Sequence, residues 1–196
     1  MRAGSLLTKY GENRQVTDMC LPLEEILAGR DERAAVQAEM LEKQHPDHTR
    51  YQDNFICQIS LNIPGYPKRL PFDFEAVEKC RSDILHAFNA VPAAEKHLVN
   101  GAGCCWIGLF KNGGISAENA KGLSVLIEEE SPAGRIFDID IITPDGTVSR
   151  NHLGIPPRKC LLCDNNAKIC AKSGEHSIKE LRTKTELFIR SICRII

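Results

Sequence analysis

The sequence predicts an α+β domain in which a mixed or antiparallel sheet is flanked by helices. Apolar and polar residues alternate between residues 54 and 63, as in a half-buried strand, whereas apolar residues between 72 and 89 recur at helical spacing. The sequence contains no Walker-type loop, and no Gly-x-Gly-x-x-Gly follows an expected strand, which argues against P-loop NTPases and nicotinamide enzymes.

The expected elements run helix, helix, strand, helix, strand, strand, strand, helix, with one additional helical turn. They are expected at 22–28, about 31–44, 54–63, about 72–89, 104–110, 123–128, 136–142 and 177 to about 194, with the additional turn at 116–122. In the strand at 54–63, Gln58 and Ser60 fall on the face opposite Phe55, Cys57 and Ile59, and this face is expected to be polar.

Capping and breaking residues set the expected ends of the helices. Pro22 stands near the start of the first helix, and Gly29 is its expected stop. Asp31 caps the second helix, and Pro46 ends it because proline cannot continue the hydrogen-bond ladder. The closing helix begins with a capping box, Ser177–Glu180.

Length and composition predict one cytoplasmic domain. The 196 residues suit a single domain, with 1–17 polar and mobile and 156–196 a cysteine-rich, helical subregion. The net charge of −1 gives no overall attraction for nucleic acid or an anionic membrane, so an anionic substrate needs local basic clusters. The beginning of the sequence does not resemble a signal peptide, and the nine cysteines are expected to be reduced thiols. Cys104 and Cys105 are expected to face opposite sides of a strand.

Asp138 and Asp140 form the sharpest local motif, within GRIFDIDIITPDG. Residues two apart in a strand point to the same side, with their α-carbons about 6.5 Å apart. Two carboxylates so placed can hold Mg²⁺, which accepts hard oxygen ligands and substrate phosphates. The simpler alternative is a solvent-facing strand that carries two surface aspartates.

Cys160, Cys163, Cys170 and His176 form a second cluster. Cys3His is an accepted ligand set for structural zinc. The alternative is that these thiols line a small helical core, with Cys163 and Cys170 stacked on one helical face. Both interpretations stay open at this point.

Basic residues stand at expected loops and helix starts, where they could meet phosphates. They are Arg30 and Arg33 beside Asp31, Lys68 and Arg69 after the Pro64-Gly65 turn, and Arg158 and Lys159 after Pro156-Pro157. For each one alone, a solvated surface charge is the simpler interpretation.

Taken together, GRDERAAVQAEMLEKQHP, IPGYPK, GRIFDIDIITPDG and IPPRKCLLCDNNAKICAKSGEH resemble the apo-citrate lyase phosphoribosyl-dephospho-CoA transferase family. The resemblance covers about 28–46 and 134–188, and is weak over about 70–120. It implies transfer of a prosthetic group from 2'-(5''-triphosphoribosyl)-3'-dephospho-CoA to a serine of the citrate lyase acyl carrier (gamma) subunit, with release of pyrophosphate. The implied enzyme is of the nucleotidyltransferase type, and a nucleotidyltransferase-like fold is an open alternative.

The resemblance assigns roles to the residues above. Asp138 and Asp140 bind the magnesium ion, and one of them or a nearby carboxylate accepts the serine proton. Arg135 and Arg158 stabilise the triphosphate and the departing pyrophosphate. Lys68, Arg30 and Arg33 bind other phosphates, and Asp31 orients the two arginines. The remaining alternatives are a zinc-stabilised binding module without catalysis and a nucleotidyltransferase for another carrier or for RNA.

Overall fold

The structure, a computed structural model, describes residues 14–42, 54–111 and 114–194, with side chains from residue 22 onward. This part of the chain contains five α-helices and a five-stranded open sheet, which confirms the predicted α+β class. The strand order is β2 (Ala94–Asn100), β3 (Gly103–Phe110), β1 (Phe55–Leu61), β4 (Phe137–Thr143) and β5 (Gly146–Val148), and every neighbouring pair is antiparallel.

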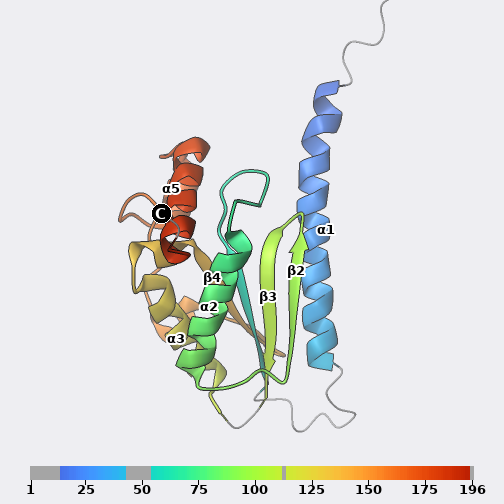
Figure 1. The fold of residues 1–196 in the computed structure, drawn as a ribbon, viewed down its shortest axis with the longest axis vertical. Helices are drawn as coiled ribbons and strands as arrows, with labels where there is room; N and C mark the ends of the chain where they lie inside the picture. The colour runs from blue at the N-terminus through green and yellow to red at the C-terminus, as the bar shows by residue number, and fades with distance from the viewer. Residues whose placement is uncertain (1–13, 43–53, 112–113, 195–196) are drawn as a thin grey trace, which may run out of the picture.

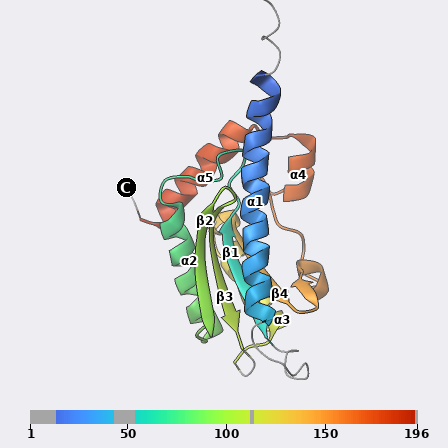
Figure 2. The ribbon, with the colours of Figure 1, turned by 90° about the vertical axis from the view of Figure 1, so that its right-hand side faces the viewer.

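Helices lie on both faces of the sheet (Figures 1 and 2). The long helix α1 (Arg14–Glu42) runs along one face beside β2, β3 and β1. On the other side lie α2 (Asp73–Phe88), α3 (Ala117–Glu129) and α5 (Ile178–Ile192). The short helix α4 (Ala167–Ser173) follows an irregular segment, and 3-10 turns occupy Pro132–Ile136 and Arg150–Leu153. None of the helices in the described part of the chain combines the length and apolar composition needed to cross a bilayer.

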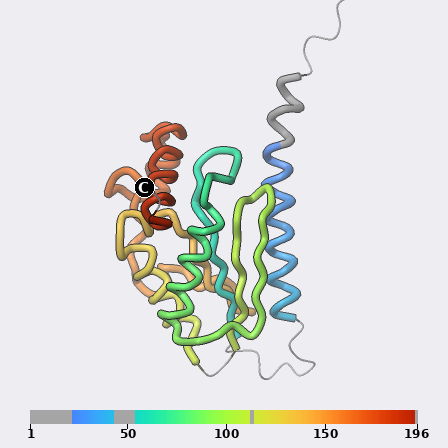
Figure 3. The backbone as a smooth tube through the Cα atoms, viewed as in Figure 1, coloured from blue at the N-terminus to red at the C-terminus, as the bar shows by residue number. Residues whose placement is uncertain are grey.

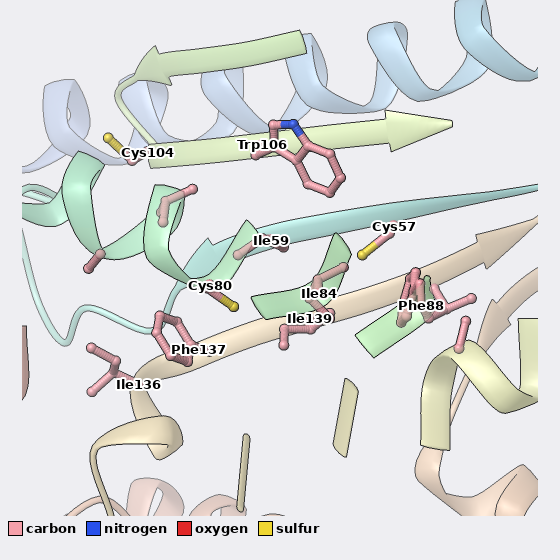
Figure 4. Packing of buried hydrophobic residues seen from close by; sticks show 14 of the residues in the cluster. Cys57, Ile59, Cys80, Ile84, Phe88, Cys104, Trp106, Ile136, Phe137 and Ile139 are labelled. Atoms are coloured by element: carbon pink, nitrogen blue, oxygen red, sulfur yellow. The ribbon is translucent and has the colours of Figure 1, made fainter. Parts of the chain in front are cut away.

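The main core lies between the sheet and α2, α3 and α5. Ile59 of β1 is paired with Trp106 on one side and Ile139 on the other, and all three side chains are fully buried. Cys80, Ile84 and Phe88 of α2 pack onto this row, as Figure 4 shows. The face of the strand at 54–63 that was predicted to be apolar is therefore the face that packs in the main core.

A smaller apolar cluster lies beneath α1. It consists of Val36, Ile56, Leu98, Cys105, Ile107 and Leu109. Ile56 interrupts the alternation of β1 because it packs here instead. Cys104 belongs to the main core and Cys105 to this cluster, which confirms that the two thiols face opposite sides.

The polar face of β1 is covered, although the sequence predicted a half-buried strand. Gln58 and Ser60 are 8% and 7% exposed. Their burial results from α1, whose residue Gln37 donates from Nε2 to Oε1 of Gln58 at 2.7 Å.

The two helices expected at 22–28 and about 31–44 are one continuous helix, α1, so the predicted stop at Gly29 is wrong. A Cβ at Gly29 would lie 2.5 Å from Oδ1 of Asn100 and 2.7 Å from the amide nitrogen of Ala102. Glycine stands here because α1 crosses the β2–β3 turn closely, a packing requirement that has no signature in the local sequence. Figure 3 shows α1 and the β2–β3 turn side by side.

The strand expected at 123–128 is the second half of α3, and the helical turn expected to end at Gly122 continues through it. The buried residues of this helix are Ala120, Lys121, Ser124, Val125 and Glu128, a helical spacing. The short apolar run at 123–127 fits either a strand or a helix. The charged residues Lys121 and Glu128 distinguish the two, because they lie two helical turns apart on the buried face. Ser116 caps the helix, since its side chain accepts from the amide of Asn119.

Three short elements escaped the sequence analysis. Edge strand β2 is mostly polar, with Leu98 its one buried residue, and β5 has three residues. Helix α4 has seven residues, and Cys170 is the one that it buries. Of the segment expected to be mobile, 1–13 lie outside the described residues and 14–17 begin α1, and the predicted end at Pro46 also lies outside them.

The capping box at the start of α5 is confirmed. The side chain of Ser177 accepts from the backbone of Glu180, whose carboxylate accepts from the backbone of Ser177. Phe188 and Ile189 then join the main core.

Candidate active site

Two aspartates of β4 share the face of the sheet that α1 covers. Alternate residues of β4 are buried in the main core, so Asp138 and Asp140 point the other way, as their spacing predicted. Across the ladder, Asp138 is paired with Ser60 and Asp140 with Gln58. The four polar side chains therefore form one patch on two central strands.

A cavity of about 340 Å³ lies over this patch, between α1 and the sheet. Asp138 and Asp140 line one side of it. Arg30 and Arg33 of α1 line the other side, and Lys68 enters from the loop after β1. Three segments that are far apart in the sequence thus place acids opposite cations.

Arg33 is the most buried cation of the cavity, with 9% of its surface exposed. Its Nη2 donates to the carbonyl oxygens of Ala102 at 2.9 Å and Gly103 at 3.1 Å. Among the described residues, Nε of Arg33 has no hydrogen-bond partner. A buried donor without a partner costs free energy, so this group is available to an anion or a water molecule in the cavity.

Lys68 lies within a group of positive charges. Its Nζ donates to the carbonyl oxygen of Ile63 at 2.8 Å. Burial lowers the pKa of Lys68, and the neighbouring charges of Arg30 and Arg182 lower it further. Arg182 of α5 donates to the carbonyl oxygens of Pro64 and Pro67, both at 2.8 Å, and so ties the Lys68 loop to the closing helix. An anion in the cavity would relieve the repulsion among these charges.

Asp140 is electrostatically unfavourable in its charged form. Burial raises the pKa of its carboxyl group, and the charge of Asp138 raises it further, against the opposing effect of Lys121. A cation beside the pair would reverse both effects, because it compensates the lost hydration and the repulsion.

Arg158 reaches Asp138 from outside the described cavity lining. Its Nη2 donates to Oδ1 of Asp138 at 3.1 Å and to Oε1 of Glu128 at 2.7 Å. Glu128 is 1% exposed, accepts from the amide of Ile139 at 3.0 Å and also binds Nη2 of Arg150 at 2.5 Å. This buried carboxylate holds Arg158 against the acid pair.

Glu128 was missed by the sequence analysis because its segment was read as a strand. Helical spacing from Lys121 would have put both charged residues on the buried face of α3. Both residues bond the backbone of Ile139 in β4. Glu128 accepts from its amide, and Lys121 donates from Nζ to its carbonyl oxygen at 2.6 Å. Gln58 and Ser60 were noticed only as the polar face of a strand.

Arg135 lies apart from the acid pair's cavity. It is not among the described residues that line it, and its Nη1 donates to the carbonyl oxygens of Cys160 at 3.0 Å and Cys163 at 3.5 Å. Its Nη2 pairs with Oδ1 of Asp164 at 3.2 Å. Asp31 is exposed and also absent from the described lining.

The second cluster comes together in space. One ligand atom from each of Cys160, Cys163, Cys170 and His176 lies within 4.8 Å of the others. Sγ of Cys163 is 3.6 Å from Sγ of Cys170 and 3.4 Å from Nε2 of His176. Cys163 precedes α4, so the idea that it stacks with Cys170 on one helical face is wrong. The arrangement is compatible with a structural zinc ion.

The thiols of this cluster differ in acidity. Burial would raise the pKa of Cys160, but backbone N–H groups of Leu162 and Cys163 and the neighbouring thiols bring it down to about 7. Burial, together with the neighbouring groups of Cys163 and Cys160, raises the pKa of Cys170 to about 12. A metal ion would favour the thiolate form at every position.

Comparisons with known proteins place the chain among transferases. A family model described as "Apo-citrate lyase phosphoribosyl-dephospho-CoA transferase" matches residues 21–192. The chain belongs to this family.

Curated relatives agree with the family match. One from Streptococcus pyogenes, named "Probable apo-citrate lyase phosphoribosyl-dephospho-CoA transferase", is 27% identical over 194 residues, which cover 92% of this chain and 88% of the relative. Relatives from Escherichia coli O7:K1 and Shigella boydii serotype 18, both named apo-citrate lyase phosphoribosyl-dephospho-CoA transferase, are each 28% identical over 173 residues, or 86% of this chain and 88% of theirs.

Proposed function

We propose that the protein transfers the phosphoribosyl-dephospho-CoA group from 2'-(5''-triphosphoribosyl)-3'-dephospho-CoA to a serine hydroxyl of the citrate lyase acyl carrier (gamma) subunit. The observation that carries this proposal is the cavity in which Asp138 and Asp140 face Arg30, Arg33 and Lys68. Cations on one wall suit a triphosphate, and acids on the other suit the ion that such a donor brings. The family match supports the identity of the acceptor.

The proposed reaction is a nucleotidyl-type transfer. The serine oxygen attacks the phosphorus next to the ribose, a new P–O bond forms, and the bond to pyrophosphate breaks. The serine proton passes to a carboxylate of the site. Asp138, Asp140 or a nearby carboxylate would accept it.

The acid pair fits a magnesium ion. Asp138 and Asp140 offer hard oxygen atoms on one face, and the raised pKa of Asp140 reflects negative charge that an ion would compensate. A magnesium ion so held would neutralise charge on the triphosphate. Arg158 at Asp138 and Arg33 with its free Nε are assigned to the phosphate oxygens, on the leaving side and the opposite wall respectively.

Two further parts of the proposal concern the whole chain. We treat it as one transferase domain, since Phe188 and Ile189 of the cysteine-rich C-terminal subregion pack in the main core. We place the reaction in the cytoplasm, because the described cysteines are all free thiols. Structural zinc is assigned to the Cys3His cluster.

The test combines the purified protein, apo-carrier, donor and Mg²⁺, and records the intact mass of the carrier together with released pyrophosphate. We expect the carrier to gain one phosphoribosyl-dephospho-CoA group only in the complete mixture, with one pyrophosphate per transfer. A carrier whose mass is unchanged under these conditions contradicts the proposal. A carrier with its acceptor serine replaced by alanine is the control, and it should gain no mass.

A further inference from the structure

The irregular segment before α4 carries both Arg158 and the first two members of the Cys3His cluster. Its two sides meet through the bridge between Lys159 and Asn166, and the amide of Cys160 donates to the carbonyl oxygen of Asn165 at 2.7 Å. The amide of Ala167 donates to the carbonyl oxygen of Arg158 at 2.9 Å. Residues 158–167 thus form a closed loop, here called the cysteine loop, with Arg158 at one end and α4 at the other.

Two arginines connect the cysteine loop to β4 and the residues just before it. Arg135 lies just before β4 and binds the carbonyl oxygens of Cys160 and Cys163. Arg158 makes the second connection, to Asp138 of the strand. A change in the shape of the loop would therefore move the guanidinium group that lies against the acid pair.

Besides these hydrogen bonds, Leu161 of the loop packs against the main core, but the helix that follows the loop adds little stability. Helix α4 is too short to be stable alone, because helices shorter than about 12 residues are marginal in water. Its buried residue is Cys170, which is itself a candidate ligand. A metal ion would join the loop (Cys160 and Cys163), the helix (Cys170) and the segment after it (His176) at one point.

We propose that a metal ion bound by Cys160, Cys163, Cys170 and His176 holds the cysteine loop in the shape that positions Arg158 at Asp138. The centre is then a positioning device for the active site, outside the cavity and without a role in the chemistry. This inference rests on the proposed function for its catalytic readout. Its structural half, a metal-dependent loop, stands separately.

The structural half is tested by metal content and limited proteolysis. The protein loaded with zinc should hold one ion per chain, and Cys163→Ser should lose it, whereas Cys193→Ser, a partly buried thiol outside the cluster, should keep it. Removal of zinc should speed trypsin cleavage after Arg158 or Lys159 by about tenfold or more, since local opening exposes these bonds. Failure to bind zinc, or equal cleavage with and without it, overturns the proposal.

The coupling to Arg158 is tested by removing zinc from the wild type and from Arg158→Ala, then measuring kcat for transfer in Mg²⁺. In the wild type we expect kcat to fall about tenfold or more while the far-UV circular dichroism spectrum is retained, and added zinc to restore it. In Arg158→Ala, zinc removal should change kcat by less than about threefold, because the two changes share one mechanism. Equal losses in both proteins overturn the positioning role. If the zinc-loaded wild type shows no transfer, the proposed function fails, and the trypsin result still decides whether zinc orders the loop.

Discussion

The two faces of the sheet use the same strands for opposite purposes. On the face covered by α2, α3 and α5, residues such as Ile59 and Ile139 are fully buried in a continuous apolar core. On the face covered by α1, the apolar cluster reaches only part of the sheet, and a polar cavity holds Asp138 and Asp140 beside it. Successive residues of β4 therefore alternate between the apolar core, which stabilises the fold, and the cavity of the proposed reaction.

This difference shows how the chain accommodates an unfavourable site. Apolar burial stabilises the main-core face, and the buried polar groups on the other face add little or oppose folding. The raised pKa of Asp140 is the direct sign of that cost. Substitutions on the two faces should therefore separate activity from stability.

Among the variants that compare the two faces, the largest expected effect is on activity, from Asp140→Asn. Loss of one carboxylate from the acid pair should lower the transfer rate on the order of 1,000-fold, about 4 kcal/mol in activation free energy. The free energy of unfolding, measured with urea, should stay the same or rise, because a partly buried charge is removed. A clear loss of stability would show that Asp140 supports the fold instead.

Ile139→Ala tests the neighbouring position on the other face. Removing most of a fully buried side chain should lower the free energy of unfolding by about 3 kcal/mol. The transfer rate per folded molecule should change little, as measured at a temperature where the variant is folded. If the rate fell as far as in Asp140→Asn, the two faces would not be functionally separate.

Substitution of Arg30 should weaken binding of the donor. We expect Arg30→Gln to raise KM for the donor about tenfold, or about 1.4 kcal/mol, with a smaller change in kcat, because the exposed guanidinium makes no hydrogen bond or ion pair with the described residues. Lys96→Gln, on the edge strand β2, is a control of equal charge change and should leave KM unaltered. Equal KM values in both variants would remove Arg30 from the donor site.

The smallest expected effect is on the pH dependence of stability. Because the pKa of Asp140 is raised in the folded state, the folded protein binds more protons than the unfolded chain between the two pKa values. Stability without Mg²⁺ should therefore fall slightly as pH rises through this window. The decrease should be smaller in Asp140→Asn, as urea unfolding at pH 4 to 7 would show. An identical slope in both proteins would contradict the assignment.

Sequence patterns predicted what depends on local periodicity and capping. The alternation of 54–63, the helical spacing of 72–89, the period-two placement of Asp138 and Asp140 and the capping box at Ser177 all agree with the structure. Most residues of the candidate site were also named as candidates from the sequence, because acidic, basic and thiol side chains can be recognised without knowing the fold.

Features that depend on tertiary contacts could not be predicted this way. Gly29 looks like a helix stop in the sequence, and only the close approach of Asn100 explains why a glycine stands inside α1. In the sequence, Glu128 stands at the end of an expected strand. Its burial depends on a tertiary contact, because its carboxylate accepts from the amide of Ile139 in β4. The resemblance assigned Arg135 to the phosphates together with Arg158, whereas in the structure its side chain donates to carbonyl oxygens of the cysteine loop.

The central claim is that the acid pair holds an ion against the phosphates of the donor. The most direct test is the Mg²⁺ dependence of carrier loading, followed by intact mass, in the wild type, Asp138→Asn and Asp145→Asn, the last being an exposed aspartate just after the same strand. We predict saturable Mg²⁺ activation in the wild type and Asp145→Asn, and no detectable loading in Asp138→Asn at any Mg²⁺ concentration. Full, Mg²⁺-activated loading by Asp138→Asn would contradict the account.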